Sequence, residues 1–283
     1  MGFHSKPTTF VGHVKIKVEN LGRSLKFYQE ALGFDILEQT ASTVKLTTDG
    51  KTSILSLEQP VNVIPKQGRT TGLYHFAILL PERSDLANIV IHLVNKGIKF
   101  GSSDHLVSEA LYLNDPDGNG IEIYIDRDPS EWSWKGEEVA MTVDPLDFKN
   151  LLTTVKPGKT WQGMPKGTVM GHIHLHVSEL KKTEEFYVKG LGFDVVNRYG
   201  GQALFLSAGK YHHHIGVNTW NGVGAPTPSL NSVGLEYFTL ILPNEEARNQ
   251  VVSNLKKIGA NVMEVNNDFI TNDPSGNKVE LAV

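Results

Sequence analysis

Residues 27–35 read FYQEALGFD, and residues 186–194 read FYVKGLGFD. The two stretches lie 159 residues apart, and the pairs Gly12-His13 and Gly171-His172 lie the same distance apart. Several matches at one fixed offset indicate a duplicated chain. We therefore infer that the second copy begins near residue 168.

Each half of the chain contains a second, shorter repeat. The turn DPDGN at residues 115–119 corresponds to DPSGN at residues 273–277, and YHF at residues 74–76 corresponds to EYF at residues 236–238. The sequence therefore contains four modules of similar length. They span residues 10–60 and 72–126, a pair within 1–126, and residues 169–220 and 234–283, a pair within 168–283. Residues 127–167 lack the repeat and are expected to connect the two pairs.

The same order of elements is predicted in every module. An alternating strand comes first, followed by an amphipathic helix that ends at a glycine such as Gly33 or Gly192. Further strands follow, and the DPxGN turn precedes the last of them. We predict an α+β fold of four βαβββ modules that form two curved-sheet barrels, each with a polar concave face lined by the first and last strands of its modules.

Composition narrows the possible functions. The 283 residues carry a net charge of −4, which disfavours a nucleic-acid partner. No apolar run is long enough to span a membrane, and no signal-peptide pattern opens the sequence, so a cytoplasmic location is expected. Cysteine is absent, whereas histidine occurs 11 times. Any bound metal must therefore be held by nitrogen and oxygen atoms.

Histidine recurs at one place in the first strand of three modules. His13, His75 and His172 occupy this position, and Tyr237 occupies it in the fourth module. The last strand of the second module carries Glu122. Two histidines and one carboxylate on a rigid sheet form the facial triad that binds non-haem Fe(II), and Mn(II) accepts the same ligands.

A run of three histidines lies in the last strand of the third module, at residues 212–214. His213 follows Gly209 by four residues, as Glu122 follows Gly118, so these two residues are expected to share a face. Strand alternation places His212 and His214 on the other face.

The four modules resemble the vicinal oxygen chelate superfamily, which includes glyoxalases, extradiol ring-cleaving dioxygenases and bleomycin-binding proteins. The second module carries the most specific match, with His105, Leu111-Tyr112, the DPDG turn and Glu122 in the order of the extradiol signature. The resemblance implies that Glu122 is an iron ligand and that His105 and Tyr112 line the substrate site. The fourth module has Phe269-Ile270 in place of Leu-Tyr.

Two ligand sets remain open. Glu122 and His75 are joined by His172 if the second and third modules share a barrel, or by His13 if the first and second do. We favour His172, because the third module also supplies a candidate base, His213, and the matching strand of the first module supplies none.

The resemblance implies that an Fe(II)-dependent extradiol dioxygenase cleaves catechol, or a substituted catechol, with O₂. His213 or His214 would accept a proton from the diol, and His105 and Tyr112 would orient its oxygens. The resemblance is also compatible with a homo-oligomer.

Two alternatives belong to other classes. A glyoxalase-like metal-dependent isomerase or lyase would need a fourth acidic ligand, for which Glu58 is the candidate. A non-catalytic small-molecule-binding (resistance) protein would need no metal. The strand of His213 and the pair His105 and Tyr112 favour the dioxygenase, because neither alternative requires them.

Overall fold

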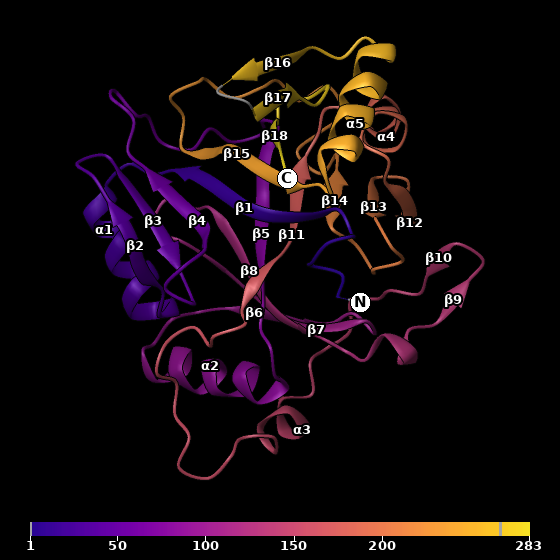
Figure 1. The fold of residues 1–283 in the computed structure, drawn as a ribbon. Helices are drawn as coiled ribbons and strands as arrows, with labels where there is room; N and C mark the ends of the chain where they lie inside the picture. The colour runs from indigo at the N-terminus through magenta and orange to yellow at the C-terminus, as the bar shows by residue number, and fades with distance from the viewer. Residues whose placement is uncertain (1, 266–267) are drawn as a thin grey trace.

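The computed structural model describes residues 2–265 and 268–283. Within these residues lie two eight-stranded sheets and a small hairpin (Figure 1). The first sheet has, in spatial order, β16 (Val262–Val265), β17 (Asp268–Asn272), β18 (Lys278–Ala282), β15 (Gly234–Ile241), β1 (Phe10–Lys17), β4 (Ser53–Glu58), β3 (Thr43–Thr47) and β2 (Asp35–Gln39). The second has β12 (Asp194–Tyr199), β13 (Ala203–Ser207), β14 (Ile215–Asn218), β11 (Val169–His176), β5 (Gly72–Leu79), β8 (Gly120–Asp126), β7 (Ser108–Asn114) and β6 (Gly101–Asp104).

Each sheet combines one module from each half of the chain. In the second sheet β5 pairs antiparallel with β11, and in the first sheet β1 pairs antiparallel with β15. The second module thus shares a sheet with the third, and the first with the fourth. The division of the chain into 1–126 and 168–283 therefore does not separate the two sheets. The predicted α+β fold of four βαβββ modules is confirmed.

Strand alternation separates the hydrophobic core from the two concave faces. In β11, Ile173 and Leu175 are fully buried in the main core, whereas His172 and His174 point to the opposite face. Residues of both sheets share this core, and the central strands β1 and β11 contact each other. The sheets therefore pack back to back, which leaves one face of each sheet to form a cup.

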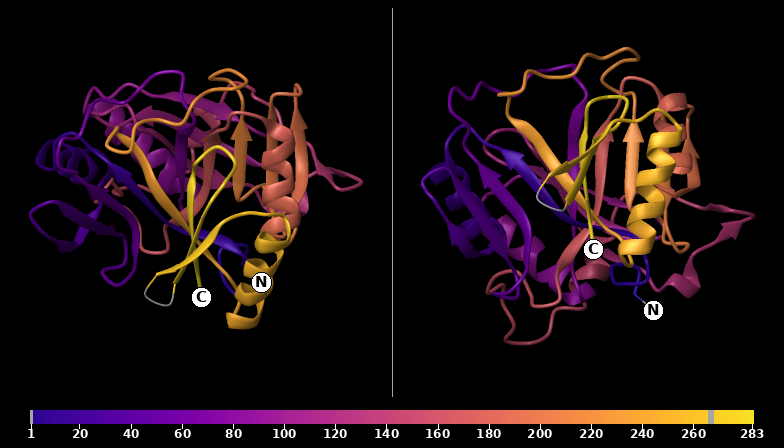
Figure 2. Two further views of the ribbon diagram at one scale, coloured as in Figure 1. Left: turned by 90° about the horizontal axis from the view of Figure 1, so that it is seen from above. Right: turned by 45° about the horizontal axis from the view of Figure 1, so that its top comes forward.

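Helices cover the remaining apolar surface. They are α1 (Leu21–Phe27), α2 (Arg83–Asn95), α3 (Phe148–Leu152), α4 (Leu180–Glu185) and α5 (Glu245–Lys257), with π-helical turns η1 (Tyr28–Leu32) and η3 (Phe186–Gly190) after α1 and α4. Figure 2 shows α4 and α5 together on the outside of the molecule. No helix within residues 2–265 and 268–283 is long and apolar enough to cross a membrane.

The DPxGN turns fasten one module to its neighbour along the chain. Tyr28 of the first module donates to Asp115 of the second, at 3.0 Å, and Tyr187 of the third donates to Asp273 of the fourth, at 3.2 Å. Each aspartate also accepts backbone N–H groups of its own turn. These repeated aspartates therefore have a structural role.

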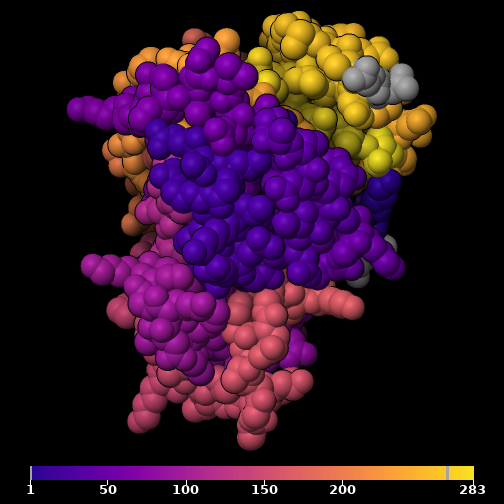
Figure 3. All heavy atoms as spheres, turned by 90° about the vertical axis from the view of Figure 1, so that its left-hand side faces the viewer, coloured from indigo at the N-terminus to yellow at the C-terminus, as the bar shows by residue number. Residues whose placement is uncertain are grey.

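Residues 127–167 connect the modules and also pack on them. They form η2 (Pro129–Glu131), the hairpin of β9 (Trp134–Lys135) and β10 (Glu138–Val139), and α3. Figure 3 shows the first module, in indigo, between the yellow fourth module and the pink connecting segment. The segment adds to the second sheet through a bridge between Asp104 and Asp144.

Candidate metal centre and substrate pocket

Strand register brings four side chains into one row across the cup of the second sheet. Tyr112 pairs with Glu122, Glu122 with Ala77, and Ala77 with His172. The small side chain of Ala77 leaves the space in which the Glu122 carboxylate reaches across to His172. His75 lies two residues before Ala77 and therefore on the same face.

The ligand atoms of the two histidines converge on one carboxylate oxygen. Oε2 of Glu122 lies 3.0 Å from Nε2 of His75 and 3.1 Å from Nε2 of His172. All three residues are buried, and their candidate ligand atoms lie within 4.8 Å of one another. Nε2 of His75 has no hydrogen bond, because its short approach to Glu122 lacks hydrogen-bond geometry. Buried polar atoms are normally satisfied, so this orphaned nitrogen fits a site that binds a cation.

The protonation states of the cluster suit a metal site. Burial lowers the pKa of His172 to about 4, although Glu122 acts in the opposite direction. Burial alone would raise the pKa of Glu122, but His172 and His75 outweigh it and hold this pKa well below its usual range. At neutral pH the cluster therefore presents a neutral imidazole and a carboxylate, which are the forms that bind metal.

The donor set indicates which metals fit. Among the described residues, this is the only group of three or more histidine, aspartate or glutamate side chains with ligand atoms close enough to share an ion. Two imidazoles and a carboxylate suit Fe(II) or Mn(II) and leave coordination positions open for other ligands.

His213 lies beside the cluster, whereas His214 does not. The ring centroid of His213 is 4.1 Å from that of His172, and His213 lines the adjacent pocket. Burial, followed by the neighbouring histidines, lowers the pKa of His213 well below its usual value. His214 instead bonds the carbonyl of Phe3 through Nε2, at 3.0 Å, and the N–H of Ala208 through Nδ1, at 3.2 Å. Both ring nitrogens are therefore occupied, and His214 does not line the pocket. The prediction that His214 could act as the base is wrong.

His105 and Tyr112 form a hydrogen-bonded pair at the pocket wall. Nε2 of His105 lies 2.6 Å from the Tyr112 hydroxyl, and Nδ1 lies 2.6 Å from the carbonyl of Thr142. A carbonyl only accepts, so Nδ1 donates to Thr142 and Nε2 accepts from Tyr112. Both side chains line the pocket that contains His75, Glu122 and His213.

The pocket is mainly apolar above the metal ligands. Its volume is about 400 Å³. The wall includes apolar and aromatic side chains that the sequence did not single out as pocket residues, namely Tyr74, Val107, Met141, Val143, Tyr199, Phe205 and Trp220. Met141 and Val143 come from the connecting segment. Trp220 is 42% exposed, so it belongs to the pocket wall and not to the core.

Residues 10–123 and 169–281 match the model of the Glyoxalase/Bleomycin resistance protein/Dioxygenase superfamily. The chain belongs to this superfamily. It is 45% identical over 269 residues to Catechol-2,3-dioxygenase of Bacillus subtilis (strain 168), which covers 94% of each chain.

Two further proteins are less similar to this chain. Biphenyl-2,3-diol 1,2-dioxygenase 3 of Rhodococcus globerulus is 30% identical over 123 residues, which cover 42% of this chain and 65% of that protein. The structure of glyoxalase I from Zea mays matches with a TM-score of 0.58 and 16% identity, over 97% of this chain and 92% of that one. The latter likeness shows the fold alone.

Among the residues that the structure describes, the first sheet has no cluster like that of His75, Glu122 and His172. His13, which corresponds to His172, bonds the hydroxyl of Ser56 at 2.7 Å. Thr239 stands where the second sheet has Ala77, and its hydroxyl donates to Glu280 at 2.6 Å. The alternative that made His13 a partner of His75 and Glu122 is therefore wrong, because His13 lies in the other sheet.

Glu58 is also remote from the cluster. It lies in β4 of the first sheet, where its carboxylate pairs with Lys15 at 2.6 Å. The structure therefore does not place Glu58 as a fourth ligand beside His75, Glu122 and His172.

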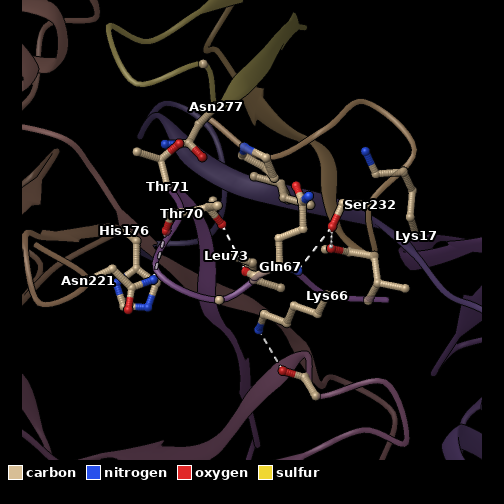
Figure 4. Close-up of a pocket in the computed structure, with 18 of the residues that line it drawn as sticks. Lys17, Lys66, Gln67, Thr70, Thr71, Leu73, His176, Asn221, Ser232 and Asn277 are labelled. Carbon is tan, nitrogen blue, oxygen red and sulfur yellow. Dashed lines mark hydrogen bonds between the residues drawn. The ribbon is translucent and has the colours of Figure 1, made fainter. Parts of the chain in front are cut away.

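A second cavity, of about 440 Å³, has a polar lining and does not include the metal ligands (Figure 4). Its lysines already have partners. Lys66 donates to the carbonyl of Gly118 at 2.6 Å, and Lys17 donates to the carbonyl of Leu230 at 2.7 Å and lies 3.4 Å from Glu236. Both of these lysines therefore already have an acceptor within the protein.

Proposed function

We propose that this protein is a non-haem Fe(II)-dependent extradiol dioxygenase, which opens the ring of catechol or a substituted catechol with O₂. The observation that carries the proposal is the convergence of His75, Glu122 and His172 at the base of a pocket that also presents His213 and Tyr112. The similarity to Catechol-2,3-dioxygenase over 94% of the chain supports a catechol-dioxygenase-like enzyme.

His75, Glu122 and His172 would hold the metal. When bound, Fe(II) would mediate electron transfer between the diol and O₂, and it would also act as a template for both. The three ligands come from neighbouring strands of one sheet, so the ligand set is rigid. Mn(II) would be held by the same atoms.

His213 would accept a proton from one hydroxyl of the diol. Its depressed pKa keeps the imidazole neutral at pH 7, as a base requires. The same residue, once protonated, can return the proton at a later step as an acid. His213 thus takes up and returns the same proton, and this proton transfer requires no second acid or base.

His105 and Tyr112 would orient the substrate. Burial first, and then the charge of Glu122, raises the pKa of Tyr112 well above its usual value, so the phenol keeps its proton. In the structure this proton is donated to Nε2 of His105. A bound diol oxygen can take over either partner of this hydrogen bond, which fixes the ring relative to the ligands.

The aromatic wall supports a substrate with an apolar ring. Tyr74, Phe205 and Trp220 surround the space beyond the histidines, and a ring or an alkyl substituent would be buried against them. Burial of the ring also excludes water from the reacting oxygens.

The two other classes have less support. An isomerase of the glyoxalase type requires a fourth acidic ligand, and Glu58 is committed to Lys15 in the other sheet. In a binding protein without metal, the buried Nε2 of His75 would have no bonding partner.

The experiment is ring cleavage after anaerobic reconstitution with Fe(II). The protein is loaded with Fe(II), mixed with 3-methylcatechol or catechol, and then exposed to air-saturated buffer. We expect a yellow ring-opened product and equimolar O₂ consumption. Glu122→Gln should lose both, whereas Glu280→Gln, the matched change in the first sheet, should retain both. An absence of colour and of O₂ consumption in iron-loaded wild-type protein would contradict the proposal.

A further inference from the structure

A line of hydrogen bonds leads away from the pocket through His213. Nδ1 of His213 lies 2.8 Å from Nδ1 of His212, and Nε2 of His212 lies 2.7 Å from Oδ1 of Asp126. Asp126 ends β8, the strand that carries Glu122, so one strand supplies both a metal ligand and the end of this line.

The line determines where the imidazole protons sit. A carboxylate accepts, so Nε2 of His212 donates to Asp126. A neutral His212 then has only a lone pair at Nδ1, and His213 must donate from its own Nδ1. Nε2 of His213 is left with a lone pair. His213 lines the pocket, so this nitrogen is the one available to a ligand.

We infer that Asp126 and His212 are positioning residues, which hold His213 in the tautomer that has its proton on Nδ1 and a free lone pair on Nε2. Only this tautomer can accept a proton from a diol and keep its bond to His212. The inference rests on the proposed function for the reaction, whereas the tautomer is a property of the protein without metal.

The surroundings of His212 support a fixed orientation. The ring is fully buried, and its centroid lies 4.0 Å from that of Tyr211 and 5.2 Å from that of Trp132. Tyr211 also donates to Oδ1 of Asp126 at 3.1 Å, and its hydroxyl lies 2.7 Å from that of Tyr124. The carboxylate thus receives two hydrogen bonds, and the imidazole is packed between aromatic rings.

His214 provides a matched control. It flanks His213 on the other side in the sequence and is equally buried, but its hydrogen bonds go to the backbone of Phe3 and Ala208. A change at His214 should therefore leave the tautomer of His213 unaltered, even though its local packing is comparable.

The first test is ¹⁵N NMR of histidine-labelled, metal-free protein at pH 7.5, with the His213 signals assigned by their loss in His213→Gln. We expect wild-type His213 to carry its proton on Nδ1. His212→Phe should shift the proton to Nε2, and His212→Gln should preserve the wild-type pattern, because the amide can donate to Asp126 and accept from His213. A proton on Nε2 of His213 in the wild-type protein would overturn the inference without any variant. An unchanged tautomer of His213 in folded His212→Phe would also overturn the inference.

The second test is kinetic. In iron-loaded protein, His212→Phe should lower kcat for 3-methylcatechol by about 100-fold, as expected for an impaired general base. Iron content should be unchanged, KM should stay within about 3-fold, and His212→Gln should restore most of kcat. An equal loss of kcat in His214→Gln, or wild-type kcat in His212→Phe, would contradict the inference. If wild-type protein shows no ring cleavage, the proposed function fails, and the NMR result still decides the tautomer.

Discussion

Gly171 lies next to the metal ligand His172, and any side chain at residue 171 would collide with a fixed tyrosine. A Cβ at this position would lie 2.0 Å from Oη of Tyr124 and 2.6 Å from its Cζ. Tyr124 is fully buried, and its hydroxyl lies 2.7 Å from that of Tyr211. The ring cannot turn aside without breaking this hydrogen bond and disturbing His172, whose ring centroid is 4.9 Å away.

Gly171→Ala should therefore lower both stability and metal affinity. Overpacking of a core costs about 1–3 kcal/mol, and loss of the buried hydrogen bond adds about 1 kcal/mol. We expect the free energy of unfolding of the metal-free protein to fall by about 2–4 kcal/mol. The assay is urea denaturation, with the midpoint compared at an unchanged m value.

Gly12→Ala is the matched control, since Gly12 holds the same position in the first module. Its Cβ would meet Cγ1 of Ile241 at 2.5 Å, and the side chain of Ile241 is partly exposed. We expect a smaller loss, of about 1–2 kcal/mol, because a partly exposed Ile241 can move toward solvent, whereas Tyr124 is fixed in the core. Equal losses for Gly12→Ala and Gly171→Ala, or wild-type stability of Gly171→Ala, would refute the reasoning.

Three further predictions concern other parts of the molecule. Tyr112→Phe should reduce kcat for 3-methylcatechol by about 10- to 100-fold in steady-state O₂ consumption, because it removes a hydroxyl that orients the diol; an unchanged kcat would count against that role. Trp220→Ala should raise KM for an aryl-substituted catechol by about 10-fold relative to catechol itself, since it removes an aromatic wall; a parallel change in both KM values would show that Trp220 does not contact the substituent. Burial, then Lys15 and Lys45, lowers the pKa of His13 to about 4, so its stabilising effect is complete above pH 6.5 and is lost as pH falls toward 4. His13→Gln should therefore remove at most about 2 kcal/mol of the fall in unfolding free energy between pH 7 and pH 5, and an unaltered pH dependence in this variant would contradict the assignment.

The modules and the cluster could be predicted because their signals are repeated. Each module repeats the same order of one strand, one helix and further strands, so a single misread position does not alter the fold. The histidine position shared by His13, His75 and His172 marked the correct face of the strands. The prediction that residues 212–214 lie in a strand is wrong, because β14 begins only at Ile215. His213 and His214 nevertheless have different surroundings, since His214 bonds the carbonyl of Phe3.

The pairing of the modules could not be derived from the sequence. The connecting segment is long enough to allow either arrangement, and the decision depends on the strand contact between β5 and β11, which joins distant parts of the chain. In the first sheet Thr239 replaces Ala77 and donates a hydrogen bond to Glu280. The sequence alone does not show this contact, so it could not explain why the first sheet differs from the second.

The pocket wall and the support of His213 were missed for a related reason. Trp220 and Met141 line the pocket but lie outside the regular strands, so no alternating pattern identifies them. Asp126 is a single acidic residue at a strand end, with no spacing that distinguishes it from a surface charge. Its role depends on the contact with His212, which is 86 residues away.

The central claim is that the second and third modules together form the metal centre, and Fe(II) binding measured anaerobically on two variants tests it most directly. His172→Ala should weaken Fe(II) affinity by at least about 100-fold, because a ligand matters at least as much as the groups that orient it. His13→Ala should keep affinity within about 3-fold of wild type, since His13 bonds Ser56 in the other sheet. Retention of iron by folded His172→Ala, or its loss from folded His13→Ala, would contradict the account.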